Sequence, residues 1–156
     1  DMKKDIKSLS PRLALLPLAT ILGSWLGAMV AYLIMNIDLT SVLQHRSLSD
    51  CLALNSGFAY YSLSSIFITE YRGAELGTIA LLANIIREMT TLLLTPLLAK
   101  WFGPLAPIST GGATTMDTTL PIITQTIGQR YVALSIYHGF VTDFSVPFLV
   151  TMWCML

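Results

Sequence analysis

The sequence predicts an all-α membrane protein, a polytopic helical bundle with about five membrane segments, two of them broken or re-entrant. Hydrophobic residues make up 54% of the 156 residues and charged residues only 12%, and the mean hydropathy is +0.67. Soluble domains carry roughly 25% charged residues. Since ~20 apolar residues make one spanning helix, the chain has room for about five crossings of a lipid bilayer. Two of these stretches are interrupted by small and polar residues.

The first expected segment, residues 13–35, is continuous and apolar. Small residues at Gly23, Ser24, Gly27 and Ala28 give it a face suited to close helix packing. Basic residues precede it, and its apolar run is longer than the core of a typical signal peptide, so we interpret it as a true span. The excess of basic residues predicts that the amino end lies on the cytoplasmic side.

The second and third segments, residues 48–69 and 76–99, differ in character. The middle of the second is crowded with small and polar residues, unlike a helix that faces lipid. The third is apolar except for an adjacent pair, Arg87 and Glu88, at its centre. The pattern predicts a break in the second segment and a continuous helix for the third.

The fourth segment, residues 104–128, contains three prolines, a Gly-Gly pair and seven threonines, which argues against an uninterrupted helix. The fifth, residues 131–156, is long and apolar but includes His138 and Asp143. We therefore expect residues 1–156 to form one transmembrane domain whose fourth segment is broken.

The charged pair in the third segment needs a physical explanation. A charge at the centre of a bilayer costs roughly 2.5–3.5 kcal/mol on insertion scales, so such residues usually face a bundle interior or a water-filled cavity. Adjacent residues of a helix do not face each other, so Arg87 and Glu88 do not satisfy one another. Two interpretations stay open: polar contacts that pack helices together, or a role in a substrate or ion pathway.

Three more ionisable groups are expected at membrane depth, Asp117, His138 and Asp143. Together with Glu88 they suit a cationic substrate or a proton relay, because burial favours the protonated form of a carboxylate. Simpler interpretations are a helix cap for Asp117 and interhelical hydrogen bonds for His138 and Asp143.

The two breaks supply the other half of a binding site. Backbone groups freed by an interrupted helix line a cavity or are buried in protein, and the amino ends of half-helices attract anions such as a substrate carboxylate. An amino acid with a positive side chain would then meet backbone amides at one end and carboxylates at the other. The candidate binding residues are Asn55, Ser56, Gly57, Tyr61, Ser62, Glu88, Gly111, Gly112, Thr114, Asp117 and His138, with Arg87 and Asp143 in support.

Several other classes of function have little support in the sequence. It contains neither H-E-x-x-H nor G-x-S-x-G, and a pair such as Ser56 and His138 arises easily by chance, so we expect no enzyme. Cys51 and Cys154 have no metal-ligand spacing, and we expect no metal and no cofactor. A formal net charge of zero gives no indication of a nucleic-acid partner.

Four stretches together resemble one known family, in order and in spacing. They are SGFAYYSLSSIFITE (56–70), ANIIREMTTLLLTPLL (83–98), GGATTMDTTLPIITQTIG (111–128) and HGFVTDFSVPFLV (138–150). Residues 13–156 resemble the carboxy-terminal half of the LysO-type lysine exporters.

The resemblance implies export of L-lysine, and of toxic analogues such as thialysine, across the bacterial inner membrane by a multi-pass transporter. It implies a functional role for Glu88, which follows an arginine inside a helix, and it places Asp117 and His138 within family motifs. Asp143 lies where the family pattern is less restrictive.

Full-size members of the family have further helices ahead of this region. The resemblance therefore implies a partner chain, an amino-terminal half that is fused in a longer protein, or oligomerisation of this chain. Alternating access driven by a cation or proton gradient is the expected mechanism. The alternatives are a holin-like or ion-conducting membrane protein and a structural subunit of a larger membrane complex.

Overall fold

The computed structural model describes residues 11–38 and 47–156, and within these ranges the chain is helical and contains no strand. The all-α fold class is therefore confirmed. The helices are α2 (Leu16–Asp38), α3 (Leu48–Asn55), α4 (Tyr61–Arg72), α5 (Ala74–Phe102), α6 (Ala106–Gly111), α7 (Leu120–Ile127) and α8 (Val132–Met155), joined by the short 3-10 turns η1 (Pro11–Leu15), η2 (Gly112–Met116) and η3 (Gln129–Tyr131).

Three helical stretches of the described chain are long and apolar enough to cross a membrane: Leu13–Ile34, Ala74–Phe102 and Gln129–Met155. The other two expected segments correspond to pairs of short helices, α3 with α4 and α6 with α7. Both breaks fall where small and polar residues are clustered in the sequence. In contrast, α8 continues through Pro147 without interruption.

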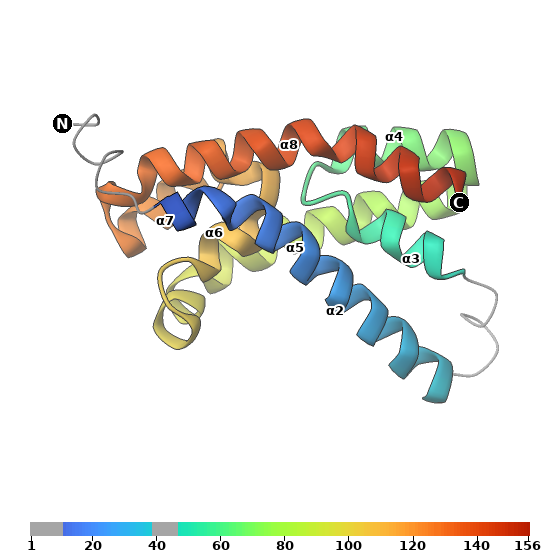
Figure 1. Ribbon diagram of the computed structural model, residues 1–156, viewed down its shortest axis with the longest axis horizontal. Coiled ribbons are helices and arrows are strands. Elements are labelled where there is room, and N and C mark those ends of the chain that lie inside the picture. Colours follow the sequence, from blue (N-terminus) through green and yellow to red (C-terminus); the bar gives the residue numbers. More distant parts are fainter. Residues whose placement is uncertain (1–10, 39–46) are drawn as a thin grey trace.

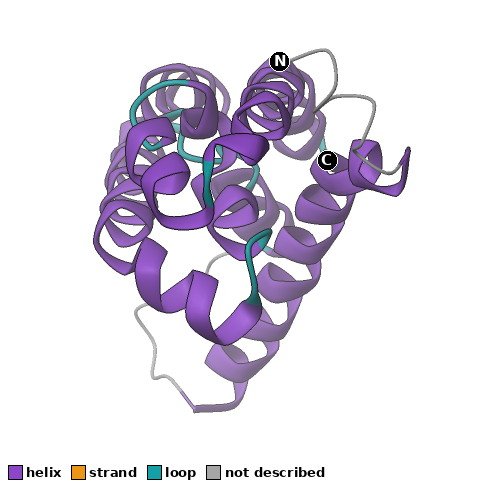
Figure 2. Ribbon diagram, turned by 90° about the vertical axis from the view of Figure 1, so that its left-hand side faces the viewer, coloured by secondary structure: helices purple, strands orange, loops and turns teal. Residues whose placement is uncertain are grey.

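The long helix α8 runs along the length of the molecule, with α3 and α4 packed against it (Figure 1). Seen along the bundle, the non-helical connections lie among the helices (Figure 2). The beginning of α2 packs against the bundle through the buried side chains of Thr20 and Ile21, and its second half diverges from it (Figure 1). Large apolar side chains of that half, such as Leu33 at 59% exposure, are left for lipid or for further protein.

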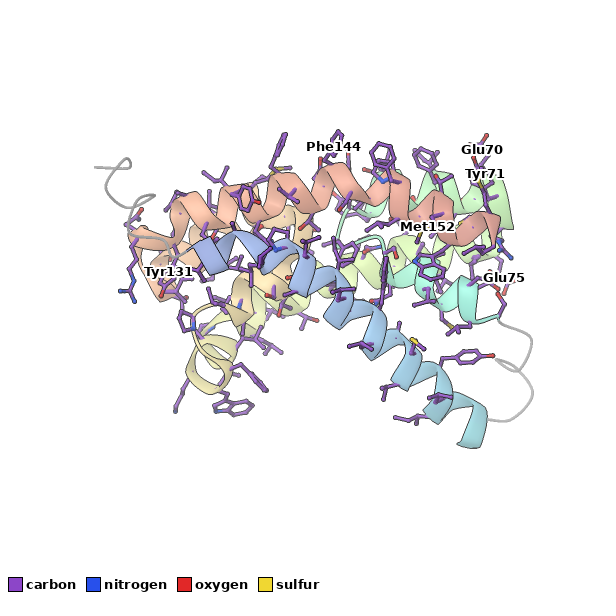
Figure 3. The ribbon with its side chains drawn as sticks, in the orientation of Figure 1. Glu70, Tyr71, Glu75, Tyr131, Phe144 and Met152 are labelled. Atoms are coloured by element: carbon purple, nitrogen blue, oxygen red, sulfur yellow. The ribbon has the colours of Figure 1, made fainter. Side chains whose placement is uncertain are left out.

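Charged and aromatic residues lie at the two ends of the bundle, and an apolar ring projects from its middle (Figure 3). Glu70, Tyr71 and Glu75 lie at one end of the molecule, and Tyr131 lies at the other (Figure 3). Between them, the ring of Phe144 projects outward from the middle of α8 (Figure 3). This distribution is that of a membrane protein whose long helices run across the bilayer.

Arg72 holds three helices together at one of these ends. The Arg72 guanidinium donates from Nε to the Cys154 carbonyl at 3.1 Å and from Nη2 to the Trp153 carbonyl at 3.4 Å. Its Nη1 lies 3.4 Å from Asp50 Oδ1. One side chain of α4 thus binds the last carbonyls of α8, where a helix favours positive charge, and also holds α3.

Helices α4 and α5 form an antiparallel pair that packs closely at one glycine. A Cβ atom built on Gly77 would lie 1.8 Å from Thr69 Oγ1 and 2.9 Å from the Ser65 carbonyl oxygen. A side chain at this position would therefore force the two helices apart.

We expect Gly77→Ala to lower the free energy of unfolding by about 1–3 kcal/mol, because the added methyl group overpacks the α4–α5 contact. Thermal unfolding of the purified protein in detergent measures this effect. Gly23→Ala is the matched control, since a Cβ atom there has nothing within 4 Å. Equal stability of the two variants would contradict the close contact.

Candidate functional site

The first helix break, residues 56–60, is held by an asparagine of α5. Within it Phe58 and Ala59 have φ angles of +45° and +69°, which are uncommon for residues other than glycine. Asn84 Oδ1 accepts a hydrogen bond from the Ala59 amide at 2.8 Å, while its Nδ2 donates to Ser64 Oγ at 3.2 Å and to the Ala80 carbonyl at 2.9 Å. The amide side chain therefore satisfies a backbone group that the break leaves free.

The second break begins at Gly112 and meets the first. The Ala113 amide donates to the Phe58 carbonyl at 2.9 Å. Gly112 has a φ angle of +61°, and a Cβ atom there would lie 2.3 Å from the Phe58 oxygen. Only glycine allows the two segments to approach this closely, so the two breaks form one continuous structure.

Arg87 binds the half-helix α6 rather than a carboxylate. Its Nε donates to the Thr110 carbonyl at 2.9 Å and its Nη2 to the Ser109 carbonyl at 3.2 Å. Its guanidinium carbon also lies 5.2 Å from the centre of the Phe58 ring, within the range of a cation–π contact. The arginine thus satisfies carbonyls at the carboxy end of α6, where positive charge is favourable.

A cavity of about 270 Å³ lies where the two breaks and α8 come together. One wall is Ala59–Ser62, which leads into α4, and the other is formed by Ala113, Thr114, Met116, Asp117 and Thr118. Asp117 belongs to the second wall, and Asp143 joins the lining from α8. Of the predicted binding residues, Tyr61, Ser62, Thr114, Asp117 and Asp143 are therefore brought together.

The two aspartates retain free oxygen atoms. Asp117 Oδ1 accepts hydrogen bonds from the Thr118 amide at 2.6 Å and from Thr118 Oγ1 at 3.1 Å, and its other oxygen has no hydrogen bond within the described ranges. Neither this aspartate nor any other side chain of the described residues caps α7. Asp143 has no hydrogen bond or ion pair to a described residue. Both carboxylates can therefore accept a cation from the cavity.

The amino end of α4 lies at the same cavity. Tyr60, Tyr61 and Ser62 belong to its lining. In the described part of the chain, no side chain caps this end of α4. The first amides of a helix carry partial positive charge, so this wall suits an anion, whereas Asp117 of the second wall and Asp143 of α8 are carboxylates.

Two of the predicted binding residues, Asn55 and Ser56, do not line the cavity. Asn55 Nδ2 donates to the Ser24 carbonyl of α2. Ser56 is buried, donates to the Leu52 carbonyl at 2.7 Å and accepts a hydrogen bond from Trp25 Nε1 at 2.9 Å. These contacts attach the first break to α2.

Two glycines of the candidate set also serve close packing. A Cβ atom on Gly57 would lie 2.2 Å from Asn84 Nδ2, and one on Gly111 would lie 2.6 Å from Thr115 Cγ2. Neither glycine is among the residues that line the cavity. The space that each leaves is filled by a neighbouring side chain.

His138 is fully buried and joins three elements. Its Nε2 lies 3.0 Å from Thr20 Oγ1 of α2, and its Nδ1 lies 3.3 Å from Thr115 Oγ1 of η2. Thr115 Oγ1 also donates to the Ser135 carbonyl at 2.9 Å. The imidazole therefore fixes the second break to α8, which is the interhelical role that the sequence left open.

Glu88 is half-buried on α5. Its carboxylate makes no hydrogen bond or ion pair with any described residue, and it is not among the residues of the cavity lining. Its functional role stays a prediction.

Asn84 is not among the binding residues that the sequence predicts, and neither are Tyr60, Met116 and Thr118 of the cavity lining. The signal was present: an asparagine within a long apolar helix, three residues before Arg87 and so on the same face. Buried amides in membrane helices are rare and make hydrogen bonds to neighbouring elements. A systematic search for such residues would have found it.

These features define a class of architecture. The chain is a polytopic α-helical membrane protein in which two interrupted helices meet at a polar cavity, as they do in secondary transporters. Comparison with known proteins then identifies the family. The model of the lysine exporter LysO family matches residues 1–154, and the chain belongs to this family.

Two curated relatives are similar along most of the chain. The lysine exporter LysO of Escherichia coli (strain K12) is 31% identical over 142 residues, which cover 91% of this chain and 44% of that protein. A putative lysine exporter of Haemophilus influenzae is 33% identical over 129 residues, or 83% of this chain and 61% of that protein. The chain thus spans about half the length of the curated relatives it matches. No solved structure matches it.

We expect Arg87→Gln to destabilise the protein by about 1.5–3 kcal/mol, because two charge-assisted hydrogen bonds to α6 are lost inside the bundle. Thermal unfolding in detergent measures the loss. Arg130→Gln is the matched control, since the exposed Arg130 contacts only the Tyr131 ring, at 4.8 Å, among the described contacts. Equal unfolding temperatures for both variants would show that the α6 contacts contribute nothing.

Proposed function

We propose that this chain forms the substrate-binding half of a transporter that exports L-lysine. The observation that carries the proposal is the cavity between the helix breaks, whose lining includes Asp117, Asp143 and the uncapped amino end of α4. Membership of the LysO family and the names of the two relatives support the same substrate.

The cavity has the chemistry and size for a cationic amino acid. The side-chain ammonium of lysine would bind between Asp117 and Asp143, and its carboxylate would face the amides that begin α4 and the hydroxyl of Ser62. A cavity of about 150 Å³ accepts benzene, so one of about 270 Å³ has room for a lysine molecule. Thialysine presents the same charged ends and would bind in the same way.

Alternating access is the proposed mode of export. Two carboxylates that line one cavity repel each other once the substrate leaves, which favours the uptake of another cation or of a proton. Proton or cation exchange at Asp117, Asp143 and Glu88 would therefore couple export to an ion gradient. The transporter would lie in the bacterial inner membrane, and another chain, a fused amino-terminal half or a second copy would supply its remaining helices.

Removing both cavity carboxylates tests the site. We expect Asp117→Asn combined with Asp143→Asn to lower lysine efflux about tenfold or more, since an unpaired ammonium is then left in the cavity. Efflux is measured in cells that lack other lysine exporters, at equal abundance in the membrane. Glu70→Gln, at the exposed end of the bundle, is the control.

Each outcome of this experiment bears on the proposal. Unchanged, saturable lysine efflux in the double variant would place the substrate elsewhere. A lysine-independent ion conductance in the wild type, without saturable efflux, would instead favour an ion-conducting protein.

The proposed role of Glu88 has its own test. We expect Glu88→Gln to lower resistance to thialysine, because the neutral amide cannot exchange a proton or attract the ammonium. Growth in graded thialysine, with any missing half present and membrane abundance equal, measures the effect. Full resistance would refute the role of Glu88 without affecting the proposal for the cavity. If the variant instead fails to co-purify with its partner, the chain is a structural subunit.

A further inference from the structure

Asn84 uses every polar atom of its side chain although it lies in the middle of a membrane-spanning helix. It is 3% exposed. Its oxygen accepts from the Ala59 amide at 2.8 Å, and its nitrogen donates to Ser64 Oγ at 3.2 Å and to the Ala80 carbonyl at 2.9 Å. The first of these bonds joins α5 to the helix break, and the second joins α5 to α4.

The segment that Asn84 holds is in an unfavourable conformation. Phe58 and Ala59 have φ angles of +45° and +69°, where the Cβ atom of an L-residue meets its own backbone. Such conformations persist where the surrounding structure imposes them. The neighbouring Gly57 leaves the space that the Asn84 amide occupies, because a Cβ atom there would lie 2.2 Å from Nδ2.

This strained segment connects directly to both walls of the cavity. Ala59 is itself part of the lining, and the first wall continues through Ser62. The Phe58 carbonyl accepts from the Ala113 amide at 2.9 Å, and Ala113 begins the second wall. Asn84 is not among the lining residues, so it can act on the cavity only through the backbone that it holds.

We propose that Asn84 is a positioning residue of the substrate site: by binding the Ala59 amide it sets the separation of the two cavity walls, and hence the affinity for a cationic amino acid. The proposal rests on the function proposed above. It differs from a role in stability alone, because it assigns Asn84 an effect on substrate affinity that other buried polar residues of α5 do not have.

Kinetics of the complete transporter in inside-out membrane vesicles test this proposal. We expect Asn84→Ala to raise the KM for lysine about tenfold at equal membrane abundance, since one buried hydrogen bond to the wall is lost. Thr95→Val is the matched control: Thr95 is buried on the same helix and its hydroxyl bonds only the Thr91 carbonyl, at 2.6 Å, of its own helix. Its KM is expected to stay unchanged.

Rescue separates positioning from general stability. In the Asn84→Ala background, Ala59→Gly removes the steric cost of a φ angle of +69°, so we expect the KM to return toward the wild-type value. If Asn84→Ala does not accumulate in the membrane, Gly57→Ala serves instead, since its methyl group displaces the Asn84 amide. An unchanged KM in whichever variant accumulates would overturn the proposal.

A labelling measurement tests the positioning role of Asn84 even if the protein does not transport lysine. Ser62→Cys, in a background with Cys51→Ala and Cys154→Ala, reports the accessibility of the first wall to a small maleimide. We expect Asn84→Ala to change the labelling rate several-fold with or without lysine. If the wild type transports no lysine but the rate still changes, the proposed function fails and the positioning role survives; an unchanged rate overturns the positioning role.

Discussion

The hydrogen bond between the Ala113 amide and the Phe58 carbonyl is the contact on which the rest of the site depends. In a lipid bilayer no water satisfies the backbone groups of an interrupted helix, so a break is stable only where protein supplies partners. Here the two breaks supply partners to each other, at 2.9 Å. Because they meet, the polar residues that follow each of them face one cavity instead of two separate surfaces.

The positive and negative side chains near the two breaks have different environments. Arg87 donates hydrogen bonds to the last carbonyls of α6 and lies over the face of the Phe58 ring. These contacts stabilise its positive charge. The carboxylates of Asp117 and Asp143 have no such cationic partner among the described residues. The cavity therefore has an excess of negative charge, and electrostatics favours a cation in it. The positive residue thus stabilises the fold, whereas the two negative residues keep no cationic partner in the described part of the chain.

The sequence predicted the features that depend on local composition. Long apolar runs predicted the spanning helices, and clusters of small and polar residues predicted both breaks, because backbone preference acts over a few residues. Asp117 and Asp143 were also selected, and both line the cavity. The pairing of the breaks through Phe58 and Ala113 depends on contacts between distant residues, which local patterns do not encode. For the same reason Gly112 resembled a ligand site, whereas its lack of a side chain lets two backbones touch.

The two cavity walls are attached to different helices. Asn84 holds the first wall to α5, while Thr115 and His138 hold the second to α8. The contacts of Arg87 end at Thr110, before the second wall begins, and Gly112 lies between them. The Ala113–Phe58 hydrogen bond is therefore the backbone link between a wall held by α5 and a wall held by α8. Breaking it would leave an amide and a carbonyl without partners inside the bilayer, so this one bond fixes how far apart the two walls lie.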